Sequence, residues 1–423
     1  MIALALFKPK IKVGKISIGT YWLVTLAGAA VLLAAGLVGF GELWQGLTSN
    51  EAINPLKILV LFISMTVLSI FLDETGFFRY LANLVLKKTG SNQLKLFTAL
   101  YAAISILTIF TSNDIIILTF TPFVCYFAKN AKIDPVPYLI MTFIAANTCS
   151  MLLIIGNPTN IYLATAQGID FFAYLKVMAL PTLFAFIAAY AVMLPLFWKK
   201  LKLPIERNEE EVVIEHKPLL ITGLVFLSAC TVLLAVSSYI GIEMWIVALA
   251  GALGMIAAVL LICAAAKRKP KELGVTVRRA PWELIPFILS MFVIVLSLKT
   301  YGVTERLASL LKEDGVVFVY GASSALFANL INNIPMSVLF SSVIQNISGS
   351  AVSAQAVYAA IIGSNLGAFL TPVGALAGLM WLQILSAHDI KFSFIRFVKY
   401  GFVIGVPVLA AALSGLLIAS AWI

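Results

Sequence analysis

The sequence contains few of the charged residues that a soluble protein needs on its surface. Only 11% of its 423 residues are charged and 61% are apolar, whereas soluble domains are about 25% charged. This scarcity excludes a soluble enzyme. The net charge of +10 is divided among short clusters between apolar segments, which excludes the continuous basic face of a nucleic-acid-binding protein. We therefore expect a membrane protein without a nucleic-acid partner.

Cysteine and histidine are also scarce, with four and two residues. All four cysteines lie inside apolar segments without paired spacing, which predicts buried thiols and excludes a disulfide framework or a zinc site. The histidines, His216 and His388, fall at predicted helix ends on the cytoplasmic side. The sequence has no Walker motif for ATP hydrolysis. We expect no metal and no cofactor other than a coupling ion, either a proton or sodium.

Seven long apolar segments are spread along the chain. Each is long enough to cross about 30 Å of hydrocarbon. The first follows a basic N-terminus but is too long for a signal peptide, so it predicts a retained helix with a cytoplasmic N-terminus in the inner membrane. The segments are 18–41, 55–72, 172–198, 218–237, 242–266, 284–300 and 394–421.

Four further apolar regions are interrupted by polar residues. Regions 94–130 and 316–347 have polar tips at 111–114 and 332–335, and predict re-entrant hairpins. Two long segments around 138–167 and 355–387 are broken by Gly-Asn-Pro-Thr-Asn at 156–160 and by Thr-Pro-Val-Gly at 371–374. Irregular backbone at membrane depth survives only when it is buried in protein or lines a wet cavity. The four interruptions should therefore converge on one site.

An internal repeat relates the two halves of the chain. Residues 64–84 align without gaps on 290–310, and a polar-tipped hairpin and a broken helix follow both copies. The predicted fold is an all-α polytopic membrane protein with two inverted-topology repeats, each with a re-entrant hairpin and a broken transmembrane helix. The first repeat covers 1–200, a cytoplasmic linker and linker helix cover 201–240, and the second repeat covers 241–423. The identical pairs are Ser64/Ser290, Met65/Met291, Val67/Val293, Leu72/Leu298, Gly76/Gly302, Leu81/Leu307, Ala82/Ala308 and Leu84/Leu310.

Charge asymmetry between the two copies supports the inversion. The flank 77–95 carries four basic residues and no acid, whereas 303–315 carries two basic residues and three acids. Basic flanks stay in the cytoplasm, so the two copies should face opposite sides of the membrane. Asp73 and Glu74 fall at a predicted interface and should be solvated.

Inverted repeats with broken helices are typical of secondary transporters, in which freed backbone groups and half-helix ends form the binding site. Asp114 is the only acid predicted deep in the bilayer and is the candidate coupling residue. The alternatives are a capping role for Asp114, turn or cap roles for the asparagines, and simple kinks at the Thr-Pro and Pro-Thr pairs. The predicted substrate- and ion-binding residues are Ser112, Asn113, Asp114, Asn147, Thr148, Asn157, Thr159, Asn332, Asn333, Asn365 and Thr371.

Several segments resemble the arsenical-pump membrane subunit, the arsenite/antimonite permease family of the ion transporter superfamily. They are APWELIPFILSMFVIVLSLKTYGVTERLASLL (280–311), IGSNLGAFLTPVGALAGLMWLQIL (362–385), ETGFFRYLA (74–82), TSNDIIILTFTPF (111–123) and FIAANTCS (143–150). The resemblance implies proton-coupled efflux of trivalent arsenic and antimony hydroxides, alone or with a soluble arsenite-stimulated ATPase, and allows a homodimer. Asn147 and Asn365 stand where the family usually has aspartate.

Other functions remain open beside arsenite and antimonite antiport. Sodium-coupled transport of dicarboxylates or other anions, or sodium/proton antiport within the same superfamily, would use the same architecture. A membrane-embedded enzyme would need a catalytic dyad or a metal-binding carboxylate cluster, which one buried acid does not supply. An ion channel is disfavoured because an inverted duplication favours alternating access. We predict no catalytic residues.

Overall fold

The computed structural model describes residues 10–13, 16–48, 54–203, 205, 214–311, 314–347 and 349–422. Within these residues the chain is almost entirely helical, as predicted. A short antiparallel hairpin of β1 (Lys10–Val13) and β2 (Ile16–Gly19) precedes the first helix. Seven described helices are long and apolar enough to cross a membrane.

The described residues of the first half fold into nine helices and one 3-10 turn. The polar tip between α6 and α7 lies where the sequence predicts it. The break between α8 and α9 spans 150–157 and begins earlier than the predicted 156–160. The elements are α2 (Thr20–Ala34), α3 (Phe40–Thr48), α4 (Pro55–Glu74), α5 (Phe77–Thr89), α6 (Gln93–Phe110), α7 (Asn113–Asn130), α8 (Val136–Cys149), η1 (Ile154–Gly156), α9 (Pro158–Ala166) and α10 (Phe171–Leu201).

After α11 (Lys217–Val236), the second half follows the same order of helices. The short helix α3 is matched by α13, and the break between α18 and α19 spans 368–375, equal in length to the first break. The elements are α12 (Met244–Ala265), α13 (Lys271–Arg279), α14 (Leu284–Thr300), α15 (Val303–Leu310), α16 (Val316–Ile331), α17 (Asn333–Ile344), α18 (Ser350–Gly367), α19 (Leu376–Ala387), α20 (Phe394–Ala419) and η2 (Ser420–Trp422).

One predicted helix is wrong in extent. The apolar segment 18–41 contains α2, which ends at Ala34, and the chain then turns at 35–39 before α3 begins. Gly36 occupies this turn with φ of 69°, a left-handed conformation that glycine adopts without a steric penalty. Apolar character alone did not reveal the turn. The resulting α3 is short and exposes Phe40 and Trp44.

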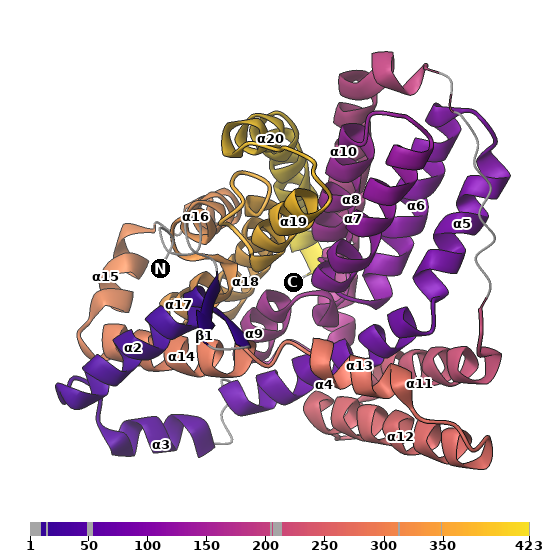
Figure 1. Ribbon diagram of the computed structural model, residues 1–423. Coiled ribbons are helices and arrows are strands. Elements are labelled where there is room, and N and C mark those ends of the chain that lie inside the picture. Colours follow the sequence, from indigo (N-terminus) through magenta and orange to yellow (C-terminus); the bar gives the residue numbers. More distant parts are fainter. Residues whose placement is uncertain are drawn as a thin grey trace.

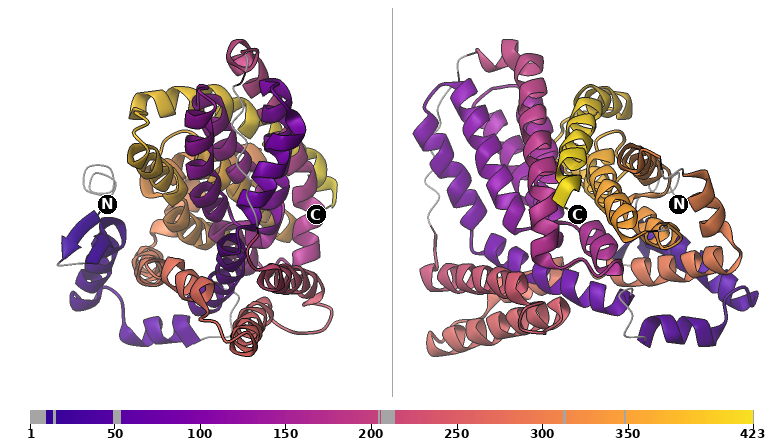
Figure 2. Two further views of the ribbon diagram at one scale, coloured as in Figure 1. Left: turned by 45° about the vertical axis from the view of Figure 1, so that its right-hand side comes forward. Right: turned by 180° about the vertical axis from the view of Figure 1, so that it is seen from behind.

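Helices from each half of the chain pack against helices of the other half. Helix α2 packs against α14 of the second half, while α12 packs against α4 of the first. Figure 1 shows α4, α11, α12, α13 and α14 along the lower edge of the molecule, with α5, α6, α7, α8 and α10 standing across them. The view from behind in Figure 2 shows α10 beside the C-terminal α20, a close pair of helices from the two halves.

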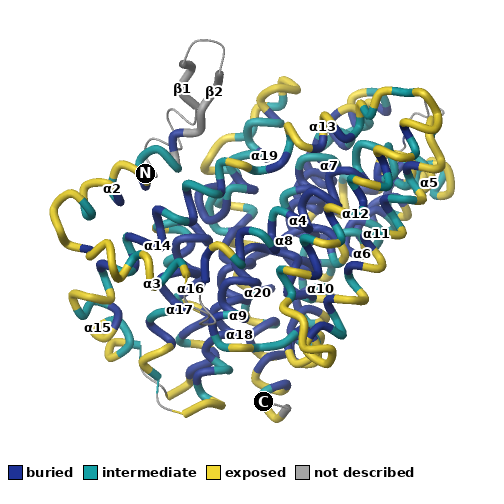
Figure 3. Tube along the Cα trace, turned by 90° about the horizontal axis from the view of Figure 1, so that it is seen from below, coloured by how far each residue is buried: buried dark blue, intermediate teal, exposed yellow. Residues whose placement is uncertain are grey.

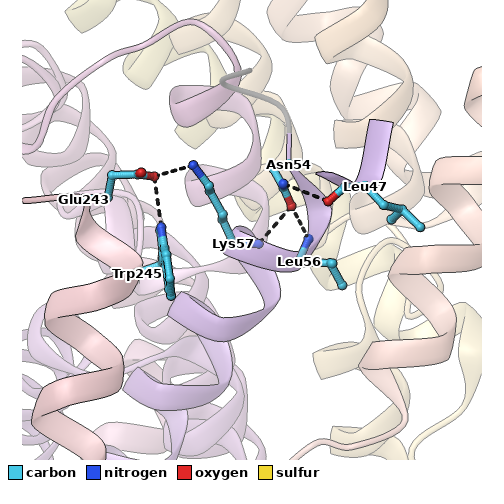
Figure 4. A network of polar contacts seen from close by, with 6 residues as sticks. All are labelled: Leu47, Asn54, Leu56, Lys57, Glu243 and Trp245. Atoms are coloured by element: carbon cyan, nitrogen blue, oxygen red, sulfur yellow. Dashed lines mark hydrogen bonds and ion pairs between the residues drawn. The ribbon is translucent and has the colours of Figure 1, made fainter. Parts of the chain in front are cut away.

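Polar contacts hold both ends of α4. At its N-terminus, Asn54 accepts hydrogen bonds from the backbone amides of Leu56 and Lys57 at 2.9 and 3.2 Å. Lys57 Nζ lies 2.7 Å from Glu243 Oε2, which also accepts a 2.9 Å hydrogen bond from the Trp245 indole (Figure 4). The N-termini of α4 and α12 therefore lie together.

At the other end of α4, Asp73 and Glu74 both contact Arg279 at the end of α13. The Asp73 Oδ2 to Arg279 Nη1 distance is 2.8 Å, and the Asp73 side chain is only 10% exposed. The expectation that these two acids are solvated is therefore wrong. The sequence did not reveal their partner because it lies more than 200 residues away along the chain.

The most buried helices lie where the halves meet. Every residue of α8 is buried, and Figure 3 shows α8, α9 and α18 as largely buried segments in the middle of the molecule. An aromatic cluster packs beside α8, in which the Phe143 ring lies 5.7 Å from Trp381 and 5.3 Å from Phe397. The breaks next to α8 and α18 are thus held in a packed interior.

Candidate functional site

The first polar tip presents one amide and one carboxyl group at the start of α7. Ser112 caps this helix, its hydroxyl accepting a 3.5 Å hydrogen bond from the Ile115 amide. Asn113 is buried, and its Nδ2 donates to Asn147 Oδ1 on α8 at 3.0 Å. Asp114 follows in the first turn, where a helix N-terminus favours negative charge. The tip is therefore joined to the end of α8 through two asparagines.

The first break is closed by two further asparagines. Asn157 caps α9, its Oδ1 accepting a hydrogen bond from the Thr159 amide at 3.2 Å. Asn160 Nδ2 donates back to the carbonyl oxygens of Ser150 and Leu153 at 2.8 and 3.2 Å. A side chain at Gly156 would place its Cβ 2.2 Å from the Ser150 carbonyl oxygen, so only glycine fits this turn. The irregular backbone at 150–157 is consequently a closely specified structure.

Asn365 on α18 connects this break to the second half of the chain. Its Oδ1 lies 2.9 Å from Asn157 Nδ2 and 3.2 Å from the Ser150 hydroxyl. Its Nδ2 donates to Asn160 Oδ1 at 2.7 Å and to the Ile361 carbonyl at 2.9 Å. Both amide atoms of Asn365 are thus fully engaged. This side chain is one of the contacts that join the two halves.

These contacts form a continuous row of buried polar side chains. The Ser150 hydroxyl also lies 3.1 Å from the Asn147 carbonyl oxygen, which joins the tip to the break. We call this row the buried polar chain. Its members, in order from the tip, are Asn113, Asn147, Ser150, Asn365, Asn157 and Asn160.

The second tip is fixed to the second break mainly through backbone atoms. Asn332 Nδ2 donates to the Val373 carbonyl at 3.0 Å, and the Asn333 amide donates to the Gly374 carbonyl at the same distance. The Thr371 hydroxyl lies 2.6 Å from Asn329 Oδ1. Asn332 has φ of 77°, which asparagine tolerates better than most residues. This tip is more heavily tied to its break than the first tip is.

The two tips also differ in charge. Ser112 and Asn332 both cap the helix that follows, so Asn113 corresponds to Asn333 and Asp114 corresponds to Ile334. Only the first tip carries an acid. Asp114 is half-buried, and within the described ranges its carboxylate has neither an ion pair nor a hydrogen bond.

Several buried oxygen atoms near the buried polar chain have no hydrogen-bond partner among the described residues. Leaving such a group unpaired costs about 1–3 kcal/mol, so these atoms are the ones free to accept a ligand. Oxygen donors suit hard cations such as sodium and also substrates that carry hydroxyl groups. No cluster of three or more His, Cys, Asp or Glu residues occurs in the described part of the chain. The unpaired atoms are Asn113 Oδ1, Thr148 Oγ1, Thr159 Oγ1 and Ser364 Oγ.

The predicted site residues therefore fall into two groups. Hydrogen bonds or adjacency in the chain bring together Ser112, Asn113, Asp114, Asn147, Thr148, Asn157, Thr159 and Asn365 around the buried polar chain, whereas Asn332, Asn333 and Thr371 belong to the second tip and break. In the described residues, no hydrogen bond between side chains joins the two groups. Their roles in binding substrate or ion stay predictions.

Three residues of the network were not predicted, namely Ser150, Asn160 and Asn329. Asn160 ends the Asn-Pro-Thr-Asn sequence. Like Asn157, it is a polar residue that interrupts a long apolar segment. Asn329 lies in the apolar helix α16, where a polar side chain usually has a partner at membrane depth. Its Nδ2 donates to the Gly367 carbonyl at 2.8 Å. Both asparagines could have been found from the sequence.

Comparison with known proteins places the chain among transporters. The model of the CitMHS citrate transporter family matches residues 17–363. The arsenical pump membrane protein of Escherichia coli (strain K12) is 29% identical over 98% of this chain and 96% of its own length. The putative arsenical pump membrane protein of Bacillus subtilis (strain 168) is 25% identical over 88% of both. The resemblance found in the sequence is therefore confirmed.

A solved structure supports the fold independently. The crystal structure of the YdaH transporter of Alcanivorax borkumensis superposes with a TM-score of 0.56 at 14% identity. The match covers 95% of this chain and 96% of that chain. At this identity the likeness concerns the arrangement of helices alone.

Proposed function

Because the chain belongs to the CitMHS citrate transporter family and is a multi-pass membrane transporter, we propose that it exports arsenite and antimonite by ion antiport. Transport proceeds by alternating access to the buried polar chain. The observation that carries this proposal is the set of buried, unpaired oxygen atoms beside a single unpaired acid. Among the described residues, no lysine or arginine side chain forms an ion pair or a hydrogen bond with the site residues. The substrate named by the similar pump proteins of E. coli and B. subtilis agrees with it.

The chemistry of the substrate fits such a site. Trivalent arsenic at neutral pH is mainly an uncharged triol, which donates and accepts hydrogen bonds but needs no countercharge. Unpaired amide and hydroxyl oxygens accept hydrogen bonds from its O–H groups, and burying it uncharged avoids the large cost of burying an ion. Asn113 Oδ1, Thr148 Oγ1 and Thr159 Oγ1 supply these acceptors.

Asp114 supplies the coupling step. In a proton antiporter a carboxyl group alternates between protonated and ionised forms as it faces the two sides of the membrane. In a sodium-coupled carrier the same group stays ionised and binds the cation together with amide oxygens. Proton antiport, sodium coupling and sodium/proton antiport would all use the carboxylate at the start of α7. Flux measurements decide which ion is coupled to transport.

A second candidate substrate rests on the family match. The matching family is described as citrate transporters, and a dicarboxylate or tricarboxylate could be held by half-helix N-termini and bound sodium without a basic side chain. Sodium-coupled transport of such anions is therefore the alternative function.

The membrane arrangement is also a proposal. We place the protein in the inner membrane with the N-terminus in the cytoplasm and the repeats inverted. The contact of α13 with the end of α4 supports this, since it brings the basic segment 267–279 to the same end as the basic flank 77–95. A soluble ATPase on the cytoplasmic loops and a homodimer are further proposals.

Uptake into inside-out vesicles tests the function. Radiolabelled arsenite, antimonite, citrate and succinate would be offered under a proton gradient alone and under a sodium gradient alone. Accumulation of arsenite and antimonite above the level of empty-vector vesicles supports the proposal. Accumulation of citrate or succinate instead, under the sodium gradient, would assign the alternative.

A further inference from the structure

A cavity lies outside the buried polar chain, between α5 and α7. Its volume is about 660 Å³, many times that of a triol with four heavy atoms. The ends of α4 and α13 and the residue after α19 complete its wall through Asp73, Arg279 and His388. All of these residues lie at the end of the molecule that we assign to the cytoplasm. The cavity thus opens on the side from which an exporter takes its substrate.

Helix α7 connects this cavity to the candidate site. The lining residues of α7 extend from Leu118 to Asn130, a length of about 18 Å at 1.5 Å per residue. Leu118 is one helical turn, about 6 Å, beyond Asp114, and residues four apart lie on the same side of a helix. The cavity therefore follows α7 from its cytoplasmic end to one turn from the proposed coupling acid.

The inner wall of the cavity contains unpaired polar groups. The hydroxyl oxygen of Thr119 is buried without a hydrogen-bond partner among the described residues. Pro122, also in the lining, has no amide hydrogen, so the carbonyl of Leu118 lacks its usual helical donor. Such groups at membrane depth are stable when water or a ligand reaches them.

The mouth of the cavity has one cation, Arg79, without an acidic partner among the described residues. Arg79 is exposed. Arg279 is paired with Asp73, and His388 lies nearby. A guanidinium group offers several donors to the oxygen atoms of an oxyacid.

We propose that this cavity is the cytoplasmic vestibule of the transporter, through which water and small oxyacids reach Asp114. Leu118 and Thr119 line the innermost part of the vestibule, and Arg79 captures the oxyacid at the mouth. This inference rests on the proposed export function for its direction and its ligand, but the existence of the vestibule can be tested without any substrate.

Cysteine labelling tests the vestibule, with Thr119→Cys compared with Thr121→Cys. Both threonines lie on α7 with buried, unpaired hydroxyl groups, but Thr121 does not line the cavity. A membrane-impermeant methanethiosulfonate should label Thr119→Cys about tenfold faster in inside-out than in right-side-out vesicles, because only an accessible thiolate reacts. Thr121→Cys should react slowly in both. The four native cysteines are buried, and the parent protein measures their background.

Equal rates for the two variants, or faster labelling of Thr119→Cys in right-side-out vesicles, would overturn the vestibule even if arsenite transport is confirmed. If Thr119→Cys fails to insert, Leu118→Cys replaces it, because Leu118 is the neighbouring lining residue. Conversely, clear labelling with no transport of arsenite would leave the vestibule in place and overturn only the proposed substrate.

The role of Arg79 has its own test. Arg79→Gln should raise KM for arsenite uptake into inside-out vesicles several-fold with little change in kcat, whereas Arg79→Lys should have a smaller effect. Arg278→Gln is the matched control, because Arg278 is an exposed arginine at the same end that does not line the cavity. An unchanged KM in Arg79→Gln would overturn capture of the oxyacid at the mouth.

Discussion

Asn365 of α18 accepts a 2.9 Å hydrogen bond from Asn157, which caps α9 more than 200 residues earlier in the chain. The same amide group donates to Asn160, so one side chain of the second half fixes both ends of the Asn-Pro-Thr-Asn sequence of the first. All three side chains are buried. In this arrangement both amide atoms of Asn365 are engaged with protein groups, and its predicted role in binding stays a prediction.

The first prediction concerns stability. Asn365→Ala removes the partners of Asn157, Asn160 and Ser150, and each buried group left unpaired costs about 1–3 kcal/mol. We expect a clearly lower melting temperature in detergent, measured by fluorescence-detected size-exclusion chromatography after heating. Asn346→Ala, which changes an exposed asparagine in the turn after α17, should melt close to the parent. Equal melting of the two variants would contradict the network described above.

The second prediction concerns coupling. Asp114→Asn should leave the protein folded and inserted, because an amide costs less to bury than a carboxylate, yet it should abolish accumulation of arsenite against a gradient. Downhill exchange can survive. The measurement is arsenite flux into inside-out vesicles. The proton gradient is varied with the sodium gradient held at zero, and then the sodium gradient is varied with the proton gradient held at zero. Asp134→Asn is the control, because Asp134 is an acid that forms an ion pair with Lys200 and is not among the site residues. Unchanged accumulation in Asp114→Asn would reduce Asp114 to a helix cap.

The third prediction concerns selectivity. A site of amide and hydroxyl oxygens without a basic side chain should let antimonite compete with arsenite. Phosphate and sulfate should not compete, because neither loses its charge at neutral pH to enter an uncompensated site. Competition is measured as inhibition of initial arsenite uptake at increasing competitor. Strong inhibition by citrate or succinate would favour the alternative function.

The fourth prediction concerns topology. A cysteine at Lys271 should react with impermeant reagents only from the cytoplasm, and a cysteine at Tyr239, in the turn between α11 and α12, only from outside. Asn50 should also be accessible only from outside, although it lies beyond the described residues. Tyr239 and Lys271 are exposed and lie on either side of α12 in the chain. Labelling of these two positions from one face would rule out the proposed arrangement.

The fifth prediction concerns pH. The hydrogen bond from Lys57 lowers the pKa of Glu243 below its ordinary value of 4.5. A group with a lowered folded-state pKa contributes stability above its unfolded pKa and loses that contribution as the pH falls through the folded value. The parent should thus be more stable than Glu243→Gln at pH 7, by up to about 1 kcal/mol for an exposed pair, and equally stable once the pH is well below 4.5. A difference that persists in acid would contradict this.

The sequence predicted the elements whose signals are local. The polar tip at 111–114 lies where the sequence predicts it, and the matched pair Gly76 and Gly302 both have a positive φ and precede a helix. These features depend on a few adjacent residues, such as a capping side chain or a glycine with positive φ.

Contacts between distant segments were not predictable in the same way. The pairing of Asp73 with Arg279, and of Asn365 with Asn157, depends on how the halves pack. The turn at Gly36 was missed because the residues around it are as apolar as the helix before it. The sequence could identify polar residues that need a partner at membrane depth, but not which partner each one has.

The different tips of the two halves have an evolutionary consequence. Immediately after a duplication the two copies are chemically equivalent at their tips. In this chain Asp114 on one copy corresponds to Ile334 on the other, and the capping Ser112 corresponds to Asn332, so the two tips have lost this equivalence at more than one position. The charge is then confined to one tip, and the second tip can diverge into the role of an anchor.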